Sequence, residues 1–472
     1  MKLFSETRGP VLELTRHFAG RMFESELFSA AGSWRSAAIG AFSMLLVTGV
    51  AAFYTGKLPV GRANASIASE SGRMLLFMAI SGLLAVFQWQ ALLPSRSDYL
   101  ALAGLPVRPR KVFTARFLAF GLFAATAVAT LTFLPSLLAP PIAPEHSLLT
   151  NAAARGVTSS MACFFALFTM VTVQGALLNL LPGRVYARCS GYVQGISAAI
   201  FFLCALESWH VAEWADAGTF LESFAWAPPV WFVCLQTDLL GRGNDSMQAL
   251  GERAVWASAA ALVSAVAIYF VSYWRYRNLL LESSAPARTG ATRGFNWIEL
   301  LVRDPRRAAV LEFMDKTLSR SRAHRLTLLG YGGLAFGLLI NSVLLALAAA
   351  HWRVDWDTLL RFMVLYWPLA ASMILIPGLR HALSVPAELN ANWIFRIHES
   401  LGRAQWMSAV EMFVLAYAVL PVFVLLTPAA IMVLGWAVGL RMVALESLAA
   451  LSIFEFLFYS WQKLPFTCAY TP

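Results

Sequence analysis

Ten apolar stretches, most of them long enough to cross a lipid bilayer, constrain what this chain can fold into. About 20 apolar residues span the hydrocarbon core as a helix, and a helix satisfies its own backbone hydrogen bonds in lipid. Only 13% of the residues are charged, whereas 59% are hydrophobic. The sequence therefore predicts an all-α polytopic membrane bundle of about ten transmembrane helices. The expected spans lie near residues 37–56, 74–94, 113–139, 156–182, 190–206, 253–273, 327–350, 358–378, 407–427 and 443–461.

The basic residues predict how these spans are oriented, because Lys and Arg concentrate in cytoplasmic loops. With a cytoplasmic N-terminus, most of the 36 Lys and Arg residues fall in inner segments, and only a few, such as Arg73 and Arg155, fall outside. We expect a multi-pass protein of the cell (inner or plasma) membrane with its N-terminus in the cytoplasm. The net charge of +10 then reflects topology and contact with membrane lipids. No nucleic-acid partner is expected.

Two amphipathic segments indicate that the chain consists of two similar halves. Residues 10–28 precede the first span and residues 306–325 precede the seventh, each with apolar residues at helical spacing. In each half, two spans lead to a cytoplasmic segment that opens near a proline, Pro94 or Pro386, and two more spans follow. We interpret this as an internal repeat. The expected domains are a first unit at 1–273 with six spans, a cytoplasmic linker with an amphipathic helix at 274–326, and a second unit at 327–472.

The second unit contains only four expected spans, so it is either incomplete or part of a natively asymmetric protein. Between the fifth and sixth spans, residues 207–252 form the longest expected outer segment, rich in aromatic residues and broken at Pro228 and Pro229. We expect short helices that enter the outer membrane interface, where tryptophan is common. The alternative is an aromatic anchor with no role in transport.

The cytoplasmic link between the second and third spans carries the most specific pattern, PSRSDYLALAGLPVRPRKVFTARFLA. Pro94 ends the span, and Ser95–Ser97 can cap a short helix. A short helix that projects inward between two spans can dock a soluble partner and move both spans as a lever. On the residues alone, a basic inner loop also serves simply as a topology signal.

This link resembles the loop between the second and third spans of ABC-2 type permeases, the membrane subunits of ABC exporters. The resemblance extends to the amphipathic helix at 11–27, the outer stretch APPVWFVCLQTDLLG, the helix around Leu311–Leu318 and the stretch PAELNANWIFRIHESLGRA. It implies two permease units fused in one chain. In that family the loop forms a coupling helix that contacts the ATPase subunit. By match, the docking residues are Arg96, Asp98, Tyr99, Leu100, Leu105 and Arg108 in the first half, and Pro386, Glu388, Leu389, Trp393, Arg396 and Glu399 in the second.

The resemblance implies the permease subunit of an ATP-driven exporter. Because the sequence contains no Walker A pattern (GxxxxGK followed by Ser or Thr), the chain is not expected to be an enzyme or to bind a cofactor itself. ATP and Mg²⁺ would be bound by separate ABC ATPase subunits. The chain itself would form a homodimer, or a pseudo-dimer through its fused halves. Two alternatives stay open: an ion-gradient-driven secondary transporter and a non-transporting membrane scaffold.

Few polar side chains lie within the expected spans, which favours a hydrophobic or amphipathic substrate. Intramembrane carboxylates are functional candidates because they are costly to bury. Glu455 lies furthest inside a span, whereas Glu411 and Glu446 lie near span ends, where they can reach water. Glu455 and Gln174 are therefore the candidate intramembrane polar residues.

Two further patterns concern packing and metals. Gly333 and Gly337 form a GxxxG pair in the seventh span, which favours close approach of a neighbouring helix. The five cysteines and seven histidines show no metal-binding spacing. No catalytic residue and no metal ligand is therefore expected.

Overall fold

Helices make up all regular structure in the described part of the chain. The computed structural model describes residues 10–23, 63–90, 109–138, 145–208, 210–211, 220–282, 304–349, 356–385, 403–459 and 464–466, with 141, 143, 302 and 461. No strand occurs among these residues, which confirms the predicted all-α class. The expected first span, 37–56, lies outside them.

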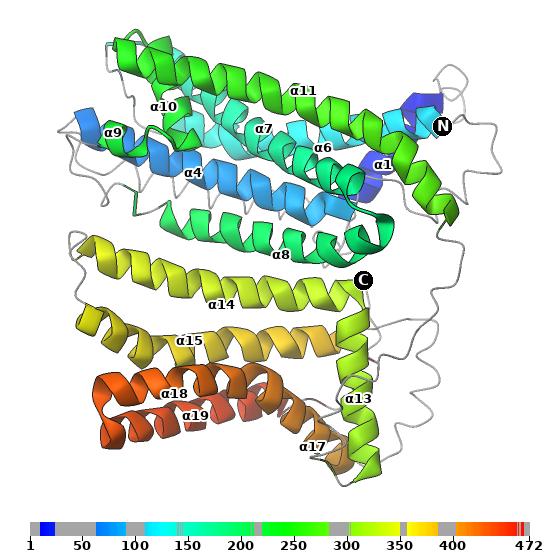
Figure 1. Ribbon diagram of the computed structural model, residues 1–472. Coiled ribbons are helices and arrows are strands. Elements are labelled where there is room, and N and C mark those ends of the chain that lie inside the picture. Colours follow the sequence, from blue (N-terminus) through cyan, green and yellow to red (C-terminus); the bar gives the residue numbers. More distant parts are fainter. Residues whose placement is uncertain are drawn as a thin grey trace. The chain divides into compact units, whose positions relative to one another are not determined.

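The described helices follow one another along the chain in the order that Figure 1 shows. Nine segments in the described part are long and apolar enough to cross a membrane, so the chain is a polytopic membrane protein. The elements are α1 (Pro10–Phe23), α4 (Ala63–Phe87), η1 (Gln88–Gln90), α6 (Pro109–Leu138), α7 (Leu148–Leu180), α8 (Gly183–Glu207), α9 (Phe220–Phe224), α10 (Pro228–Leu239), α11 (Asp245–Glu282), α13 (Pro305–Arg320), α14 (Arg322–Ala349), α15 (Trp356–Ser384), α17 (Arg403–Val414), the π-helical η3 (Leu415–Val419), α18 (Leu420–Leu434) and α19 (Trp436–Phe458).

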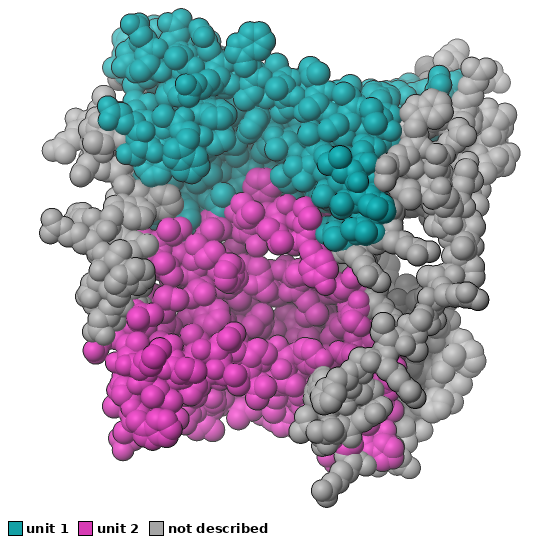
Figure 2. Space-filling model, in the orientation of Figure 1, with its two compact units in different colours: residues 1–190, 204–286, 472 teal, residues 191–203, 287–471 magenta. Residues whose placement is uncertain are grey.

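The internal contacts of the chain define two compact units (Figure 2). Unit 1 comprises Met1–Ser190, Cys204–Pro286 and Pro472, and unit 2 comprises Gly191–Leu203 and Ala287–Thr471. The middle of α8 therefore groups with the helices of unit 2, while both its ends group with unit 1.

In unit 1, α4 and the following turn η1 run parallel to α7 and keep one register from Glu70 to Trp89. Four polar contacts join them, and the two partners are 85 or 86 residues apart in the sequence every time. The constant separation means that both helices advance together from one end of the pair to the other. The contacts are Arg155 with Glu70, Ser159 with Met74, Cys163 with Phe77, and Gln174 with Trp89.

The helix α11 extends this parallel arrangement on another side of α7. Thr172 and Ser264 lie 3.1 Å apart at their hydroxyl oxygens, and Asn179 Nδ2 donates to Ser272 Oγ at 2.9 Å. The short α10 packs against α4, α7 and α11 through an apolar cluster that includes Phe232. Unit 1 is thus a layered bundle in which α7 is the shared partner of α4, α6, α10 and α11.

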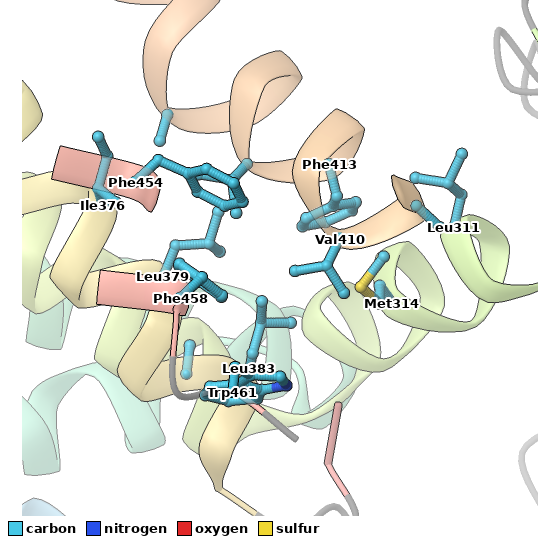
Figure 3. Close-up of a cluster of buried hydrophobic side chains, with 14 of the residues drawn as sticks. Leu311, Met314, Ile376, Leu379, Leu383, Val410, Phe413, Phe454, Phe458 and Trp461 are labelled. Carbon is cyan, nitrogen blue, oxygen red and sulfur yellow. The ribbon is translucent and has the colours of Figure 1, made fainter. Parts of the chain in front are cut away.

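In unit 2, the amphipathic α13 contributes to the core of the bundle instead of lying apart from it. Its side chains Leu311 and Met314 are fully buried against Val410 and Phe413 of α17 (Figure 3). Side chains of α15 and α19, among them Phe454, complete the same cluster. The apolar residues that recur at helical spacing in α13 are therefore buried in the core of unit 2.

The hairpin between α18 and α19 corrects the expected ends of the last two spans. The sequence predicts spans at 407–427 and 443–461, separated by a loop, whereas Gly435 alone separates Leu434 from Trp436. Gly435 has φ +80°, a left-handed conformation that glycine adopts without steric cost. The turn therefore needs one residue, and both helices extend into the stretch expected to be loop.

Both glycines of the GxxxG pair face α8, within unit 2. A Cβ atom built on Gly333 would lie 2.8 Å from Ala199 Cβ, closer than packed carbon atoms come. A Cβ atom built on Gly337 would lie 3.6 Å from Phe202 Cδ1, an ordinary contact. Gly333 therefore permits the close approach of α14 to α8, and Gly337 has room for a methyl group.

The two glycines should respond differently to the same added methyl group. Gly337→Ala should raise the free energy of unfolding by about 0.5–1 kcal/mol, because alanine is the better helix former. Gly333→Ala should lower it, because overpacking costs roughly 1–3 kcal/mol and outweighs that gain. Unfolding of the purified variants in mixed micelles measures both values. Equal effects at the two positions would contradict the close α8–α14 contact.

Candidate functional site

The structure describes the helices that enter and leave both predicted docking loops, but not the loops themselves. The predicted docking residues lie outside the described part, so their roles stay predictions. The site can therefore be built from the two loop bases, meaning the last turn before each loop and the first turns after it. The residues outside the described part are Arg96, Asp98, Tyr99, Leu100, Leu105, Arg108, Pro386, Glu388, Leu389, Trp393, Arg396 and Glu399.

The turn that enters the first loop is held by Gln174, one of the two candidate intramembrane polar residues. Its Nε2 donates to the backbone oxygen of Trp89 at 2.6 Å, and the Gln174 side chain is buried. Trp89 lies in η1, the last described turn before the loop. The final carbonyls of a helix have no partner within the helix. The Gln174 amide supplies that partner from α7.

The helix that leaves the first loop is held by two other elements of unit 1. The Arg116 guanidinium of α6 lies over the ring of Phe18 in α1, 4.8 Å from its centroid. The hydroxyl of Tyr269 in α11 donates to the backbone oxygen of Phe113 at 3.1 Å. All four residues are buried. The first two turns of α6 are thus fixed by contacts from α1 and α11.

The turn that enters the second loop receives hydrogen bonds from two directions. His324, at the start of α14, places Nε2 3.0 Å from the backbone oxygen of Val385, and its Nδ1 lies 2.6 Å from Ser321 Oγ. Because a carbonyl oxygen only accepts, Nε2 must carry a proton. The backbone N–H of Phe466 donates to the oxygen of Leu383 at 2.8 Å. The end of α15 is therefore held from both sides.

The helix that leaves the second loop is held by the amphipathic α13. Leu311 and Met314 pack on α17, as described above. The hydroxyl of Tyr417, in the π-helical η3, donates to Asp315 Oδ1 at 2.6 Å. π-helical turns occur mostly inside α-helices and often at functional sites. In both units, an amphipathic helix therefore packs on the helix that follows the predicted loop.

A buried charge cluster lies near the opposite, N-terminal ends of α4 and α7. Arg155 Nη2 donates to Glu70 Oε1 at 3.4 Å, and Arg73 forms an ion pair with the same carboxylate. Arg155 also donates from Nη1 to the backbone oxygen of Ser136 in α6, again at 3.4 Å. Arg155 is 1% exposed and Glu70 5%. Charges at such depth are costly unless they are paired.

The placement of these arginines corrects a sequence-based expectation. Arg73 and Arg155 were expected in outer loops, but they lie inside the candidate spans Ile67–Phe87 and Leu148–Leu180. A hydropathy criterion stops at a charge, so the expected spans began one residue after each arginine. The signal available was the spacing of Glu70 and Arg73, which puts the two side chains on one helix face.

Other elements of unit 1 shield the cluster from solvent. A Cβ atom at Gly72, between Glu70 and Arg73, would lie 2.4 Å from the backbone oxygen of Ser208, so the end of α8 contacts α4 there. Glu207, the preceding residue, is also buried. The cluster is therefore enclosed by the end of α8 as well as by α4, α6 and α7.

The two glutamates of α19 lie differently from what the sequence predicts. Glu455, expected inside the span, is exposed on the surface of unit 2. Glu446, expected near a span end, is buried inside Trp436–Phe458, and its Oε1 has no hydrogen-bond partner among the described residues. The earlier start of α19 after Gly435 moves Glu446 toward the middle of the helix. Glu446 is therefore the buried carboxylate of this span.

Comparison with known proteins does not assign this chain to a family. No protein-family model matches the chain, and no match was found among curated proteins or solved structures. In the described part of the chain, no three His, Cys, Asp or Glu side chains are grouped so that they could hold a metal ion.

The buried charge cluster should be far more sensitive to loss of its carboxylate than an exposed ion pair. Glu70→Gln leaves Arg73 and Arg155 without their shared partner and should lower the free energy of unfolding by about 3–5 kcal/mol. Glu145→Gln is the matched control, because Glu145 and Arg242 form an exposed pair at 3.2 Å, worth about 0–1 kcal/mol. Unfolding in mixed micelles measures both. A loss for Glu70→Gln as small as for the control would show that the buried pairing does not stabilise unit 1.

Proposed function

We propose that this chain is the membrane permease subunit of an ATP-driven ABC-type exporter, with two permease units fused in one polypeptide. It would lie in the cell (inner or plasma) membrane with a cytoplasmic N-terminus, in contact with membrane lipids. ATP and Mg²⁺ would be bound by separate ABC ATPase subunits. This chain would then be no enzyme and would move a hydrophobic or amphipathic substrate outward.

The repeated construction of the two loop bases carries this proposal. In unit 1, α1 packs on α6, the helix that leaves the first predicted docking loop. In unit 2, α13 packs on α17, the helix that leaves the second. The helix entering each loop also packs on the second candidate span after that loop, since α4 contacts α7 and α15 contacts α19. Two loops with similar bases suit two similar partners, such as a pair of ATPase subunits.

The polar contacts between α4 and α7 suggest how a push on the first loop would travel. A loop displaced by its ATPase pulls first on the turn at Trp89, which Gln174 ties to α7. The other polar contacts along the pair keep α4 and α7 moving together as far as the charge cluster. Rigid elements that move as one body transmit small displacements over long distances. A central path would then open at the end remote from the loop.

Purification from native membranes in a mild detergent tests the proposal directly. We expect a stoichiometric P-loop ATPase to copurify, and to be lost when residues 98–100 or 387–389 are scrambled. Scrambling 242–244, in the exposed turn before α11, is the control and should leave the complex intact. A chain that purifies alone in several mild detergents would contradict the proposal.

The buried charge cluster favours a second candidate, an ion-gradient-driven secondary transporter. Paired charges inside spans are typical of ion and proton pathways. Glu70 Oε2 and Arg73 Nε have no hydrogen-bond partner in the described part of the chain. The cluster can therefore accept one more hydrogen bond at Glu70 and donate one more from Arg73. In proteoliposomes without any ATPase, this candidate predicts substrate movement that stops when the ion gradient is collapsed. An exporter should move nothing under those conditions.

A further inference from the structure

A hydrogen bond from a side chain to a backbone oxygen occurs at the entrance of both predicted loops. In unit 1, a side-chain N–H of Gln174 reaches a backbone oxygen of the last turn, at Trp89. In unit 2, a side-chain N–H of His324 reaches the backbone oxygen of Val385, directly after the last residue of α15. Gln174 lies on α7 and His324 on α14. The two units thus obtain the same hydrogen bond from different helices.

A side-chain donor at this place has a physical reason. The last carbonyls of a helix lack partners, and water cannot freely supply them at a packed helix end. Trp89 and His324 are both 1% exposed. A donor brought by a neighbouring helix satisfies the carbonyl and ties the last described turn to that helix. The base of each predicted loop is therefore held in place.

We propose that Gln174 and His324 are positioning residues for the two docking loops, each acting through one donated hydrogen bond. This inference rests on the proposed function for the identity of what docks, but the positioning itself concerns only this chain. Neither residue would contact the ATPase. Each would set how well the loop beside it is presented.

His324 is also held in place itself, as a positioning residue must be. Its Nδ1 contacts Ser321 Oγ, and its ring meets the ring of Phe466 edge to face at 5.0 Å. Phe466 in turn donates its backbone N–H to Leu383, in the turn that His324 holds. The ring is thus fixed by a hydrogen bond on one side and an aromatic contact on the other. The Nε2–H of the ring donates to the backbone oxygen of Val385.

Hydrogen exchange in the purified full-length chain tests the positioning. Gln174→Met keeps the length of the side chain but removes the donor, and His324→Leu removes the imidazole N–H. Each should speed amide exchange in its own turn, residues 86–90 or 381–385, by about 2- to 10-fold, the effect of one lost hydrogen bond. His324→Gln supplies an amide donor, as Gln174 does in unit 1, and should exchange at nearly the wild-type rate.

Ser160→Ala provides a matched control, because it removes a contact between α7 and Thr132 of α6, about four turns along α7 from Gln174. It should leave exchange in both turns unchanged. If Gln174→Met does not purify, Gln174→Asn shortens the reach of the amide and gives the same test. Exchange rates equal to wild type in Gln174→Met and His324→Leu would overturn the inference.

Capture of the ATPase separates this inference from the proposed function. The donor-free variants should bind the copurifying ATPase more weakly, and His324→Gln should restore binding. If the wild-type chain captures no ATPase, the proposed function fails, and the exchange rates alone decide the positioning. If the ATPase binds all variants equally and exchange is unchanged, the inference fails and the proposed function stands.

Discussion

The constant register between α4 and α7 is the feature on which the rest of unit 1 depends. Apolar side chains alone hold helices together weakly in lipid, because lipid tails are as apolar as the side chains. Polar contacts between helices add specificity, and here each of four such contacts fits a single alignment. Sliding one helix by a turn would break all of them at once. The pair is therefore defined in length, direction and rotation.

The two units reach a similar construction with different side chains. An aromatic ring under a guanidinium joins α1 to α6, whereas aliphatic packing and the bond from Tyr417 to Asp315 join α13 to α17. What the units share is the position of each contact relative to the predicted loop, and not the residues that make it. This explains why the halves show a common organisation but little sequence identity.

The sequence predicted the class of fold and most of the spans, because hydropathy and the demands of the lipid determine both. It missed where several spans begin, since paired charges at Arg73 and Arg155 look like loop residues until their partner is known. It singled out Gln174 as a polar residue in a span, but the partner lies 85 residues away and no local pattern indicates it. Buried His324 was missed for the same reason, because its partner is 61 residues distant.

The π-helical η3 sets how the two halves of one membrane crossing are rotated relative to each other. Successive residues of a helix are separated by about 100° around its axis, so the extra residue of a π turn rotates everything beyond it. Before η3, α17 packs on α13, α15 and α19. After it, α18 packs on α15 and α19. A regular helix of this sequence would turn every side chain beyond η3 by about 100° about the axis, and α18 would lose its present alignment with α15 and α19.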